Sequence, residues 1–440
     1  MATDAPESLA TSTIFFLYET ALAVGFVFFI PYALFRMVRT PAVRAGIGQR
    51  LSLRCGTQMP ETGSRPIWIQ AVSLGEVKSV TPLVRKINER STCPVLLTTT
   101  TETGSRTARE TLGDRNAIAY FPLDFSVIVK RTLNHVRPRA VVLFETEIWP
   151  NFIRAAHSLD IPITIVNGRI SEKSFRSYRL IPGVFKNALS RVTFAGMQSA
   201  ADAERALALG ARPETVRVYG NIKFDSVPAV PSSERVERLR EELMLEDGAP
   251  LIVAGSTHKG EEEAVLAAYR KVLSRFPRTR LLIAPRHPER FDGVESVIRA
   301  AGFDVRRRSG LRGKLMTDSA PVILLDTIGE LACVYALASL AFVGGSLVKV
   351  GGHNIIEPAS LGRPVLFGPH MHHFEDVKQS FLSEGAAVKV NDEHELCAAI
   401  MKLIEEPSYC RRLGEAAKRV VEAHRGATER YFSAIERYLW

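Results

Sequence analysis

Cysteine is scarce in this 440-residue sequence and is never arranged in pairs. The five cysteines are scattered and form no C-x-x-C motif: Cys55, Cys93, Cys333, Cys397 and Cys410. This spacing argues against a disulfide framework and against a zinc site built from cysteine. It is typical of a protein of a reducing compartment.

Several motifs that would define a function class are also missing. The sequence contains no Walker P-loop, no G-x-G-x-x-G after its first predicted strand, no repeat of fixed period and no recognised nucleic-acid-binding motif. Its 46% apolar and 24% charged residues are an ordinary globular composition. The length fits two domains of roughly 150–200 residues each.

The excess of positive charge is confined to one half of the chain. Residues 1–225 contain 28 Lys and Arg against 18 Asp and Glu, whereas residues 226–440 contain 29 of each kind. A basic half indicates an anionic partner. Because no nucleic-acid motif is present, an acidic membrane surface or a phosphorylated substrate is favoured over nucleic acid.

Residues 1–40 are predicted to be a membrane anchor helix. The run from Ile14 to Phe35 is almost wholly apolar, and about 22 helical residues can span a bilayer core. Glu19 lies about one turn inside this run, where it would reach the membrane interface. By the positive-inside rule, five arginines after the run predict a cytoplasmic body: Arg36, Arg39, Arg44, Arg50 and Arg54. The alternatives are a helix lying in the interface and a hydrophobic hairpin of a soluble protein.

Apolar β-rich runs alternate with helical patterns through the rest of the chain. The alternation predicts an α/β fold with two Rossmann-like, doubly wound domains and a cleft between them. The expected strands are Ile67–Val72, Val95–Thr99, Ala140–Phe144, Ile163–Val166, Arg191–Ala195, Val216–Tyr219, Leu251–Ala254, Arg280–Ala284, Val322–Leu325, Leu340–Val343 and Val365–Phe367. A linker at Ser226–Pro231 separates domains of residues 41–228 and 229–440, and the last helix could pack back on the first domain.

Acidic residues follow two strands of the first domain. Glu76 lies at the turn between the first strand and the next helix, at the sheet edge where ligands of such folds bind. A carboxylate there can act as a general base, or it can be a helix acid that only complements the helix dipole. The run FETEIWPN places Glu145, Glu147 and Trp149 past another strand. Strand alternation would direct only one of these two carboxylates toward the cleft.

Cations and aromatic residues follow the next strand of this domain. Arg169 lies in NGRIS, and Arg176 lies in the run SFRSYR. These side chains suit a phosphorylated amphiphile presented from a membrane. A solvated basic loop is the alternative.

Three strand ends of the second domain carry groups suited to an anionic nucleotide. The turn Gly344-Gly345-Ser346 would bring backbone N–H groups to a phosphate, and a helix predicted to open at GGHN would add its N-terminus. On that helix Asn354 and Glu357 would share a face, where the Glu357 carboxylate can accept from ribose hydroxyls. The other two strand ends are Ser256-Thr257-His258 and Arg286-His287. An ordinary helix acid and an exposed loop are the alternatives.

Three histidines, His370, His372 and His373, lie close together in the second domain. They lack a fourth ligand and a regular helical spacing, so the rim of a donor pocket is favoured over a metal site.

At these motifs the sequence closely resembles the 3-deoxy-D-manno-octulosonic acid (Kdo) transferases of Gram-negative lipopolysaccharide synthesis, glycosyltransferase family 30. The resemblance runs from about residue 65 to residue 375 and also includes the apolar N-terminus. The matching stretches are WIQAVSLGEV, FETEIWPN, NGRIS, GNIKFD, AGSTHKGEE, APRHPERF, DTIGEL, AFVGGSLV and GGHNIIEPASLGRPVLFGPH.

The resemblance implies a GT-B fold with an acceptor-binding N-terminal domain and a CMP-Kdo-binding C-terminal domain. It implies an inverting transfer of Kdo onto the lipid A precursor lipid IVA at the cytoplasmic face of the bacterial inner membrane, with no metal or cofactor. Two rival functions remain: another nucleotide-sugar enzyme of this fold, such as a UDP-sugar epimerase, and an inactive, membrane-tethered lipid-binding scaffold.

By the resemblance Glu76 is the base, and the motifs supply the remaining candidates. The acceptor side comprises Glu145, Glu147, Trp149, Arg169 and Arg176. The donor side comprises Ser256, Thr257, His258, Arg286, His287, Gly344, Gly345, Ser346, Asn354 and Glu357. Pro358 stands where the family pattern leads us to expect Ala, and proline fits a first helical turn.

Overall fold

The computed structural model describes residues 9–39, 41–53, 64–113, 115–145, 147–226, 231–246, 248–311 and 322–440. The chain divides into two compact units: unit 1 is Met1–Ser226 with His424–Trp440, and unit 2 is Val227–Ala423. The predicted linker at Ser226–Pro231 lies, apart from its two end residues, outside the described residues.

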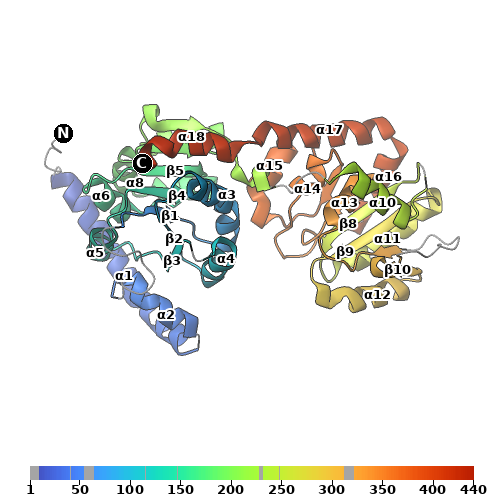
Figure 1. Ribbon diagram of the computed structural model, residues 1–440, viewed down its shortest axis with the longest axis horizontal. Coiled ribbons are helices and arrows are strands. Elements are labelled where there is room, and N and C mark those ends of the chain that lie inside the picture. The colour runs from blue at the N-terminus through green and yellow to red at the C-terminus, as the bar shows by residue number, and fades with distance from the viewer. Residues whose placement is uncertain are drawn as a thin grey trace. The chain divides into compact units, whose positions relative to one another are not determined.

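Unit 1 is built on a parallel sheet of seven strands in the order β3-β2-β1-β4-β5-β6-β7 (Figure 1). Strands β1, β2, β4, β5 and β6 are buried along their whole length, which explains their continuous apolar sequences. The strands are β1 (Ile67–Gln70), β2 (Val95–Thr99), β3 (Ala117–Tyr120), β4 (Ala140–Phe144), β5 (Ile163–Gly168), β6 (Phe194–Met197) and β7 (Val216–Val218).

Helices cover both faces of this sheet. Helices α5, α6, α8 and α9 pack on one face, and α3, α4 and α18 pack on the other. The helices of unit 1 are α1 (Leu9–Arg39), α2 (Pro41–Arg50), α3 (Leu74–Arg90), α4 (Glu102–Leu112), α5 (Ser126–Val136), α6 (Pro150–His157), α7 (Glu172–Tyr178), α8 (Pro182–Ser190), α9 (Ala200–Ala208) and α18 (Ala427–Leu439), with 3-10 turns η1 (Pro213–Thr215) and η2 (Ile222–Ser226).

Helix α18 belongs to unit 1 although it is the last helix of the chain. Asp225 caps it, because the Asp225 carboxylate accepts hydrogen bonds from the N–H groups of Gly426 and Thr428, both at 2.6 Å. The Tyr431 hydroxyl donates to the carbonyl of Gly220 at 2.9 Å. The C-terminal segment therefore completes the core of the first unit.

Unit 2 repeats the architecture with a parallel sheet in the order β10-β11-β9-β8-β12-β13-β14. Its strands are β8 (Leu251–Thr257), β9 (Arg280–Pro285), β10 (Val305–Arg307), β11 (Val322–Leu324), β12 (Leu340–Val343), β13 (Val365–Phe367) and β14 (Val388–Lys389). Its helices are α10 (Ser233–Glu242), α11 (Glu261–Arg275), α12 (Phe291–Ala300), α13 (Leu331–Leu337), α14 (Ile356–Ser360), α15 (Glu375–Ser383), α16 (Glu393–Glu405) and α17 (Pro407–His424), with 3-10 turns η3 (Pro288–Arg290), η4 (Arg308–Gly310) and η5 (His372–Phe374).

The predicted α/β fold with two Rossmann-like, doubly wound units is confirmed. The strand predicted at Arg191–Ala195 is displaced, since Arg191 ends α8 and β6 begins at Phe194. Three strands were not predicted: β3, β10 and β14. Strands β10 (VRR) and β14 (VK) are short and carry cations, so they lack the apolar run on which the prediction depended, whereas β3 (AIAY) has such a run and was missed.

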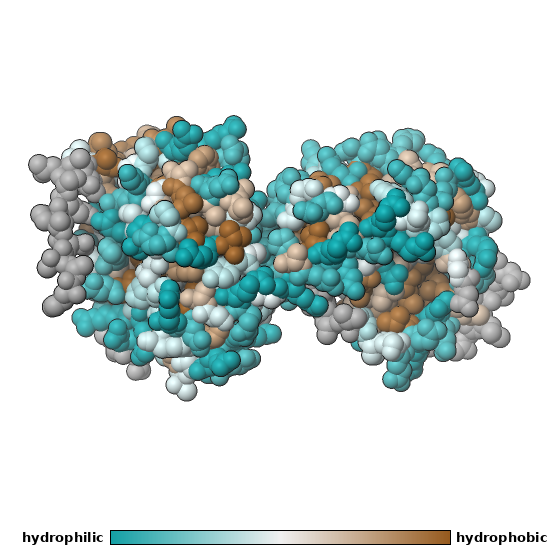
Figure 2. All heavy atoms as spheres, turned by 90° about the horizontal axis from the view of Figure 1, so that it is seen from above, coloured by the Kyte–Doolittle hydropathy of each residue, from teal (hydrophilic) through white to brown (hydrophobic). Residues whose placement is uncertain are grey.

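The predicted spanning segment of residues 14–35 falls within α1. No helix in the described part of the chain is long and apolar enough to cross a membrane. The position predicted for Glu19 is wrong, because the Glu19 carboxylate accepts a hydrogen bond from the backbone N–H of Ser126 in unit 1. In the view of Figure 2, most of the visible surface of both units is hydrophilic, with hydrophobic residues in separate groups.

Candidate active site

Ligands of doubly wound folds bind at the carboxyl ends of the strands, where the strand order reverses beside the first strand of the sheet. The reversal lies between β1 and β4 in unit 1 and between β8 and β12 in unit 2. The predicted site residues follow these strands: Glu76 follows β1, Glu145 follows β4, His258 follows β8 and Gly344 follows β12. The topology thus gathers the candidates of each unit at one edge of its own sheet.

Glu76 lies in the first turn of α3, and Ser73 is the N-cap of this helix. The Glu76 N–H donates to Ser73 Oγ at 3.4 Å, and the Ser73 hydroxyl donates to Glu76 Oε1 at 3.0 Å. The Val72 N–H donates to Glu76 Oε2 at 2.8 Å. This arrangement is close to a capping box, and it holds the carboxyl at the sheet edge.

Burial and two like charges raise the proton affinity of Glu76. Burial, followed by the charges of Glu145 and Glu147, raises the pKa of Glu76 to about 8, and the hydrogen bonds from Val72 and Ser73 oppose the rise. A carboxylate with such a pKa is a much stronger base than an ordinary glutamate. It suits general-base chemistry near neutral pH.

The predicted alternation of Glu145 and Glu147 is wrong. Strand β4 ends at Phe144, and Glu145 has a left-handed backbone conformation with a φ of 62°. The chain therefore turns at this residue, and strand alternation stops. Both carboxyls lie near enough to Glu76 for their charges to raise its pKa.

An ion pair holds Glu145 at the sheet edge. Lys223 Nζ lies 3.4 Å from Glu145 Oε1, and both side chains are 14% exposed. The Asn167 side-chain amide donates to the same oxygen at 3.4 Å, and Asn167 also has a left-handed φ, of 56°. Strained non-glycine residues of this kind concentrate at functional sites. The sequence prediction missed Asn167 and Lys223, although both lie in the matching stretches NGRIS and GNIKFD.

Glu147 is paired with Trp149, whose indole N–H donates to Glu147 Oε2 at 2.7 Å. Burial raises the pKa of Glu147 to about 7, and the hydrogen bond from Trp149 opposes the rise. The indole ring also packs against Phe121, with ring centroids 5.4 Å apart. Trp149 is thereby held with its polar edge on the carboxyl and its apolar body on the core.

The two predicted acceptor arginines differ in exposure. Arg169 follows β5 and is half-buried, whereas the Arg176 side chain is 78% exposed on α7. Arg176 Nε donates to Glu172, four residues earlier on the same helix, at 3.0 Å. Only Arg169 directly follows a strand of the sheet, at the edge where the carboxyl groups lie.

In unit 2 the turn after β12 is filled by a carboxylate of the protein. Glu261, at the start of α11, is fully buried. It accepts hydrogen bonds from the N–H groups of Gly345 (2.6 Å), Ser346 (2.9 Å), Leu347 (2.9 Å) and His258 (2.9 Å). The N–H groups that were expected to bind a phosphate are therefore occupied by Glu261, a role that the sequence prediction missed.

Ser346 and Gly344 support this turn through packing. Ser346 is fully buried, its hydroxyl donates to the Val343 carbonyl, and it accepts from the Gly368 N–H. A Cβ on Gly344 would lie only 2.6 Å from the Ser256 carbonyl oxygen. Gly344 thus permits the close approach of β8 and β12.

Two histidines meet beside the turn. His258 Nε2 and His353 Nε2 lie 2.8 Å apart, so one proton is shared between two rings inclined by only 7°. Burial, then the neighbouring His258 and Arg286, lowers the pKa of His353 to about 4. Gly345 leaves room for both rings, since a Cβ there would lie 2.9 Å from His353 Cδ2. His353 was not among the predicted site residues, although it stands in the quoted GGHN motif.

Arg286 and His287 follow β9 and are both exposed. The Arg286 N–H donates to the Thr257 carbonyl at 3.0 Å, which attaches this loop to the end of β8. Arg290, four residues after Arg286, makes a bidentate ion pair with the buried Glu262 at 2.8 and 3.0 Å. Of the two arginines of this loop, Arg286 therefore has the more exposed guanidinium group.

Asn354 and Glu357 lie together, but not for the predicted reason. Helix α14 begins at Ile356, so Asn354 precedes the helix. The Asn354 side-chain oxygen accepts from the Ile356 N–H at 3.1 Å, and its amide donates to Glu357 Oε1 at 3.3 Å. Burial raises the pKa of Glu357, opposed first by the Asn354 bond and then by the charge of Arg286.

The described residues contain no cluster of His, Cys, Asp and Glu that could hold a metal ion. The His373 N–H donates to the Gly351 carbonyl at 3.0 Å, and the His370 N–H donates to Ser346, so this histidine-rich loop borders the Gly351–Asn354 segment. Within the described range Cys93, Cys333, Cys397 and Cys410 are free thiols.

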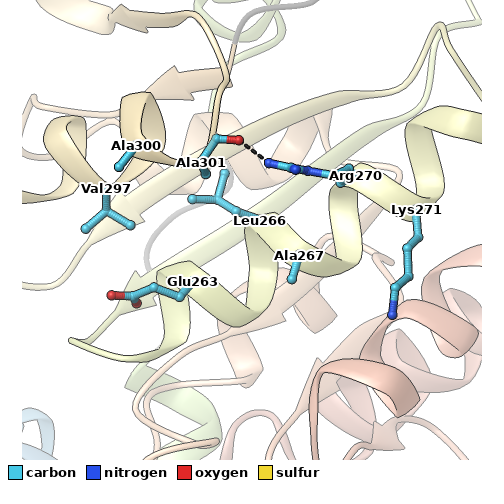
Figure 3. Close-up of a pocket in the computed structure, with 8 residues that line it drawn as sticks. All are labelled: Glu263, Leu266, Ala267, Arg270, Lys271, Val297, Ala300 and Ala301. Carbon is cyan, nitrogen blue, oxygen red and sulfur yellow. Dashed lines mark hydrogen bonds between the residues drawn. The ribbon is translucent and has the colours of Figure 1, made fainter.

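A hollow of about 530 Å³ lies between α11 and α12 of unit 2 (Figure 3). Mostly apolar side chains line it, among them Leu266, Val297 and Ala301, and the Arg270 guanidinium closes one part by donating to the Ala301 carbonyl. None of the predicted site residues lines it. The candidate chemistry belongs instead to the two sheet edges.

Comparison with known proteins identifies the family. A family profile described as 3-Deoxy-D-manno-octulosonic-acid transferase (kdotransferase) matches residues 46–226. The 3-deoxy-D-manno-octulosonic acid transferase of Haemophilus influenzae is 33% identical over 404 residues, which are 91% of this chain and 93% of that protein. The chain belongs to this transferase family. As a member of the Kdo transferase family it is a glycosyltransferase.

Further comparisons agree with this family and with the fold. The 3-deoxy-D-manno-octulosonic acid transferase of Bordetella pertussis is 35% identical over 397 residues, 88% of this chain and 90% of that protein. The structure of a UDP-GlcNAc 2-epimerase from Neisseria meningitidis matches 84% of this chain and 100% of its own, with a TM-score of 0.54 and 12% identity. At that identity the likeness shows the fold alone, and it agrees with the GT-B class.

Proposed function

We propose that this Kdo transferase family member moves Kdo from CMP-Kdo onto the phosphorylated lipid A precursor lipid IVA, with inversion at the anomeric carbon. The observation that carries the proposal is the carboxyl of Glu76, held at the strand-order reversal of unit 1 with a pKa near 8. Such a group can take the proton of an acceptor hydroxyl as that hydroxyl attacks.

The bonds change in one displacement step. The acceptor oxygen forms a bond to the anomeric carbon of Kdo, and its proton passes to Glu76. The bond from the anomeric carbon to the phosphate oxygen breaks, and its electron pair leaves with CMP. Because the leaving group carries a single phosphate, cationic and hydrogen-bonding side chains suffice to stabilise the developing charge.

On the donor side, Arg286 and His287 supply exposed donors for the phosphate and the Kdo carboxylate. His258 lies beside them, with ring centroids of His258 and His287 5.4 Å apart. Glu357, oriented by Asn354, would accept from the ribose hydroxyls. In the Gly344-Gly345-Ser346 turn, the N–H groups of Gly345 and Ser346 donate to Glu261 and are not available to a phosphate. This turn, together with Ser256 and Thr257, would instead form part of the wall of the donor pocket.

On the acceptor side, Glu147 and Trp149 would contact the sugar of the lipid precursor next to Glu76, and Glu145 would tune the base. Arg169 and Arg176 would bind its phosphates, which accounts for the basic character of residues 1–225.

The first helix would lie on the anionic surface of the bacterial inner membrane, with both units on the cytoplasmic side. Its apolar side chains toward solvent support this placement: Phe16, Leu17, Val24, Val27 and Phe28 are 51–81% exposed. Nearby on unit 1, Leu180 is 81% exposed in the segment before α8, which contacts α1. Apolar residues at this density are typical of a surface that enters the membrane interface.

The test uses purified full-length protein, CMP-Kdo and lipid IVA in detergent. We expect CMP release and a lipid product heavier by Kdo in the wild type. In Glu76→Gln we expect kcat to fall by about 10²- to 10⁴-fold, the contribution of a general base, with unchanged affinity for CMP. Glu89→Gln, an exposed residue of the same helix, is the matched control and should behave as wild type. Substantial activity in Glu76→Gln would overturn the assignment of the base, and no Kdo-bearing product from the wild type would overturn the proposed function.

A further inference from the structure

One face of α1 packs against and hydrogen-bonds to the rest of unit 1. Phe15 is buried on this face, and the Arg154 guanidinium of α6 lies 4.5 Å from the centre of its ring. Tyr18 and Glu19, one turn further on, are half-buried and hydrogen-bonded to unit 1. Phe26 packs edge-to-face on Phe125 at 5.7 Å. The helix therefore has a face fitted to the protein as well as an apolar face toward solvent.

Glu19 satisfies donors at the start of two helices of unit 1. Its Oε1 atom accepts from the backbone N–H of Ser126, the first residue of α5, at 2.8 Å. The same oxygen accepts from the side-chain amide of Asn151 in α6 at 3.4 Å. Helix α5 has no side-chain cap from its own N-cap residue, Phe125, so Glu19 supplies the missing acceptor.

Tyr18 acts on the second helix through Asp124. Asp124 is buried and accepts from the N–H groups of Asn151 (3.1 Å) and Phe152 (2.8 Å), which caps α6. The Tyr18 hydroxyl donates to Asp124 Oδ2 at 3.3 Å. Asn151 also donates its side-chain amide to the Asp124 carbonyl at 2.6 Å. Asn151 thus joins both capping carboxylates to one helix start.

The start of α6 directly follows the segment that carries the proposed acceptor residues Glu147 and Trp149. Trp149 is the N-cap residue of α6, and it makes no side-chain cap of its own. Its indole N–H instead donates to Glu147. Asp124 accepts from the backbone N–H groups of Asn151 and Phe152, and Glu19 accepts from the Asn151 side chain. Because these bonds fix the first turn of α6, they also fix the positions of Trp149 and its partner Glu147.

We propose that Tyr18 and Glu19 are positioning residues of the acceptor site, so that α1 is a working part of the acceptor-binding unit as well as its contact with the membrane. The proposal rests on the proposed function, because it assigns Glu147 and Trp149 to the acceptor. It predicts that loss of the α1 contacts weakens acceptor binding even where no membrane is present.

The test separates positioning from membrane attachment by using an acceptor without acyl chains. Full-length wild type, Glu19→Ala and Tyr18→Phe are assayed with CMP-Kdo and a deacylated, water-soluble form of the lipid A precursor. We expect Glu19→Ala to raise the KM for this acceptor roughly tenfold, because it removes two partly buried hydrogen bonds at the starts of α5 and α6, and Tyr18→Phe to raise it less. The KM for CMP-Kdo and flotation with vesicles of anionic phospholipid should not change.

Thr20→Ala is the matched control, because the Thr20 hydroxyl is exposed and bonds only within α1, to the Phe16 carbonyl. An unchanged acceptor KM in both Glu19→Ala and Tyr18→Phe would overturn the inference and leave α1 as a membrane contact alone. A general loss of folding in Glu19→Ala would lower the apparent kcat and the Tm, and Tyr18→Phe, which keeps the ring, then decides. A wild type that transfers no Kdo to either acceptor would instead overturn the proposed function.

Discussion

Glu76 of unit 1 and Glu261 of unit 2 occupy matching places in the two sheets. Each lies in the first turn of the helix that follows the strand at the reversal point, α3 after β1 and α11 after β8. Glu76 accepts one N–H and one hydroxyl, and two neighbouring carboxyls repel its charge. Glu261 accepts four N–H groups. Place in the fold alone therefore does not separate a base from a structural anion.

The number of donors decides between the two roles. Each N–H bonded to a carboxylate stabilises the charged form and reduces its tendency to take a proton. Burial raises the pKa of Glu261 as well, but four backbone donors oppose that rise and leave the carboxylate no free lone pair directed at a substrate. Each carboxyl oxygen of Glu76 accepts only one of the hydrogen bonds from Val72 and Ser73, and the like charges around Glu76 increase its basicity. The same residue type at the same topological place thus has a different hydrogen-bonding environment in each unit, and only that of Glu76 suits the proposed base.

The largest expected contrast is in stability. Glu261→Gln replaces an anion by an amide that faces four N–H donors, and we expect unit 2 to lose about 2–4 kcal/mol of unfolding free energy. Urea denaturation measures the loss, with Glu263→Gln, an exposed residue of the same helix, as control. Glu76→Gln should lose activity with little change in stability. Equal stability of Glu261→Gln and wild type would break the comparison.

Glycines at the two sheet edges provide the next contrast. A Cβ at Gly344 would lie 2.6 Å from a backbone oxygen, whereas the nearest atom to a Cβ at Gly75 is Ser73 Oγ at 3.8 Å. We expect Gly344→Ala to cost about 1–3 kcal/mol through overpacking. Gly75→Ala should be neutral or slightly stabilising, since alanine is the better helix former. Thermal unfolding of both variants tests this, and a tolerated Gly344→Ala would show that the β8–β12 approach is not tight.

The pH dependence of transfer sharpens the description of the base. A base must lose its proton before it can act, so kcat/KM should rise with pH up to about 8, the pKa of Glu76. Glu145→Gln removes a charge that raises this pKa. We therefore expect the acid limb of the pH profile, the range in which kcat/KM rises with pH, to move to lower pH by roughly one unit. A profile of kcat/KM from about pH 5 to about pH 10 measures the shift, because this range extends roughly two units below the lowered value and roughly two units above a Glu76 pKa near 8. A limb that does not move would exclude coupling between the two carboxyls.

Ser73→Ala should give the smallest effect and the opposite sign. It removes the N-cap of α3, worth about 1 kcal/mol of stability. It also removes a hydrogen bond that lowers the pKa of Glu76, so the acid limb should move to higher pH. Ser73→Thr, which keeps the hydroxyl, is the control, and a limb that shifts downward in Ser73→Ala would contradict the assigned hydrogen bond.

Strand prediction succeeded where strands are buried on both faces, as in Val95–Thr99, Ala140–Phe144 and Leu340–Val343, whose bounds match the structure. It failed at edge strands such as β10, where burial no longer demands an apolar run. Glu76 could be placed from the sequence because a strand followed by a helix start fixes the sheet edge. Lys223, Asn167 and His353 could not, since their partners Glu145 and His258 lie far away along the chain.

The sequence by itself determined the two doubly wound units, the edges at which their chemistry lies and the family to which the chain belongs. These follow from local patterns of apolar runs, helix starts and short motifs. Only the tertiary structure decided which carboxylate keeps acceptor capacity, as the proposed base requires, which one is used up as a structural anion, and that Glu19 caps a helix of unit 1. These outcomes depend on hydrogen-bond donors contributed by segments distant along the chain, and such donors meet only when the chain is folded.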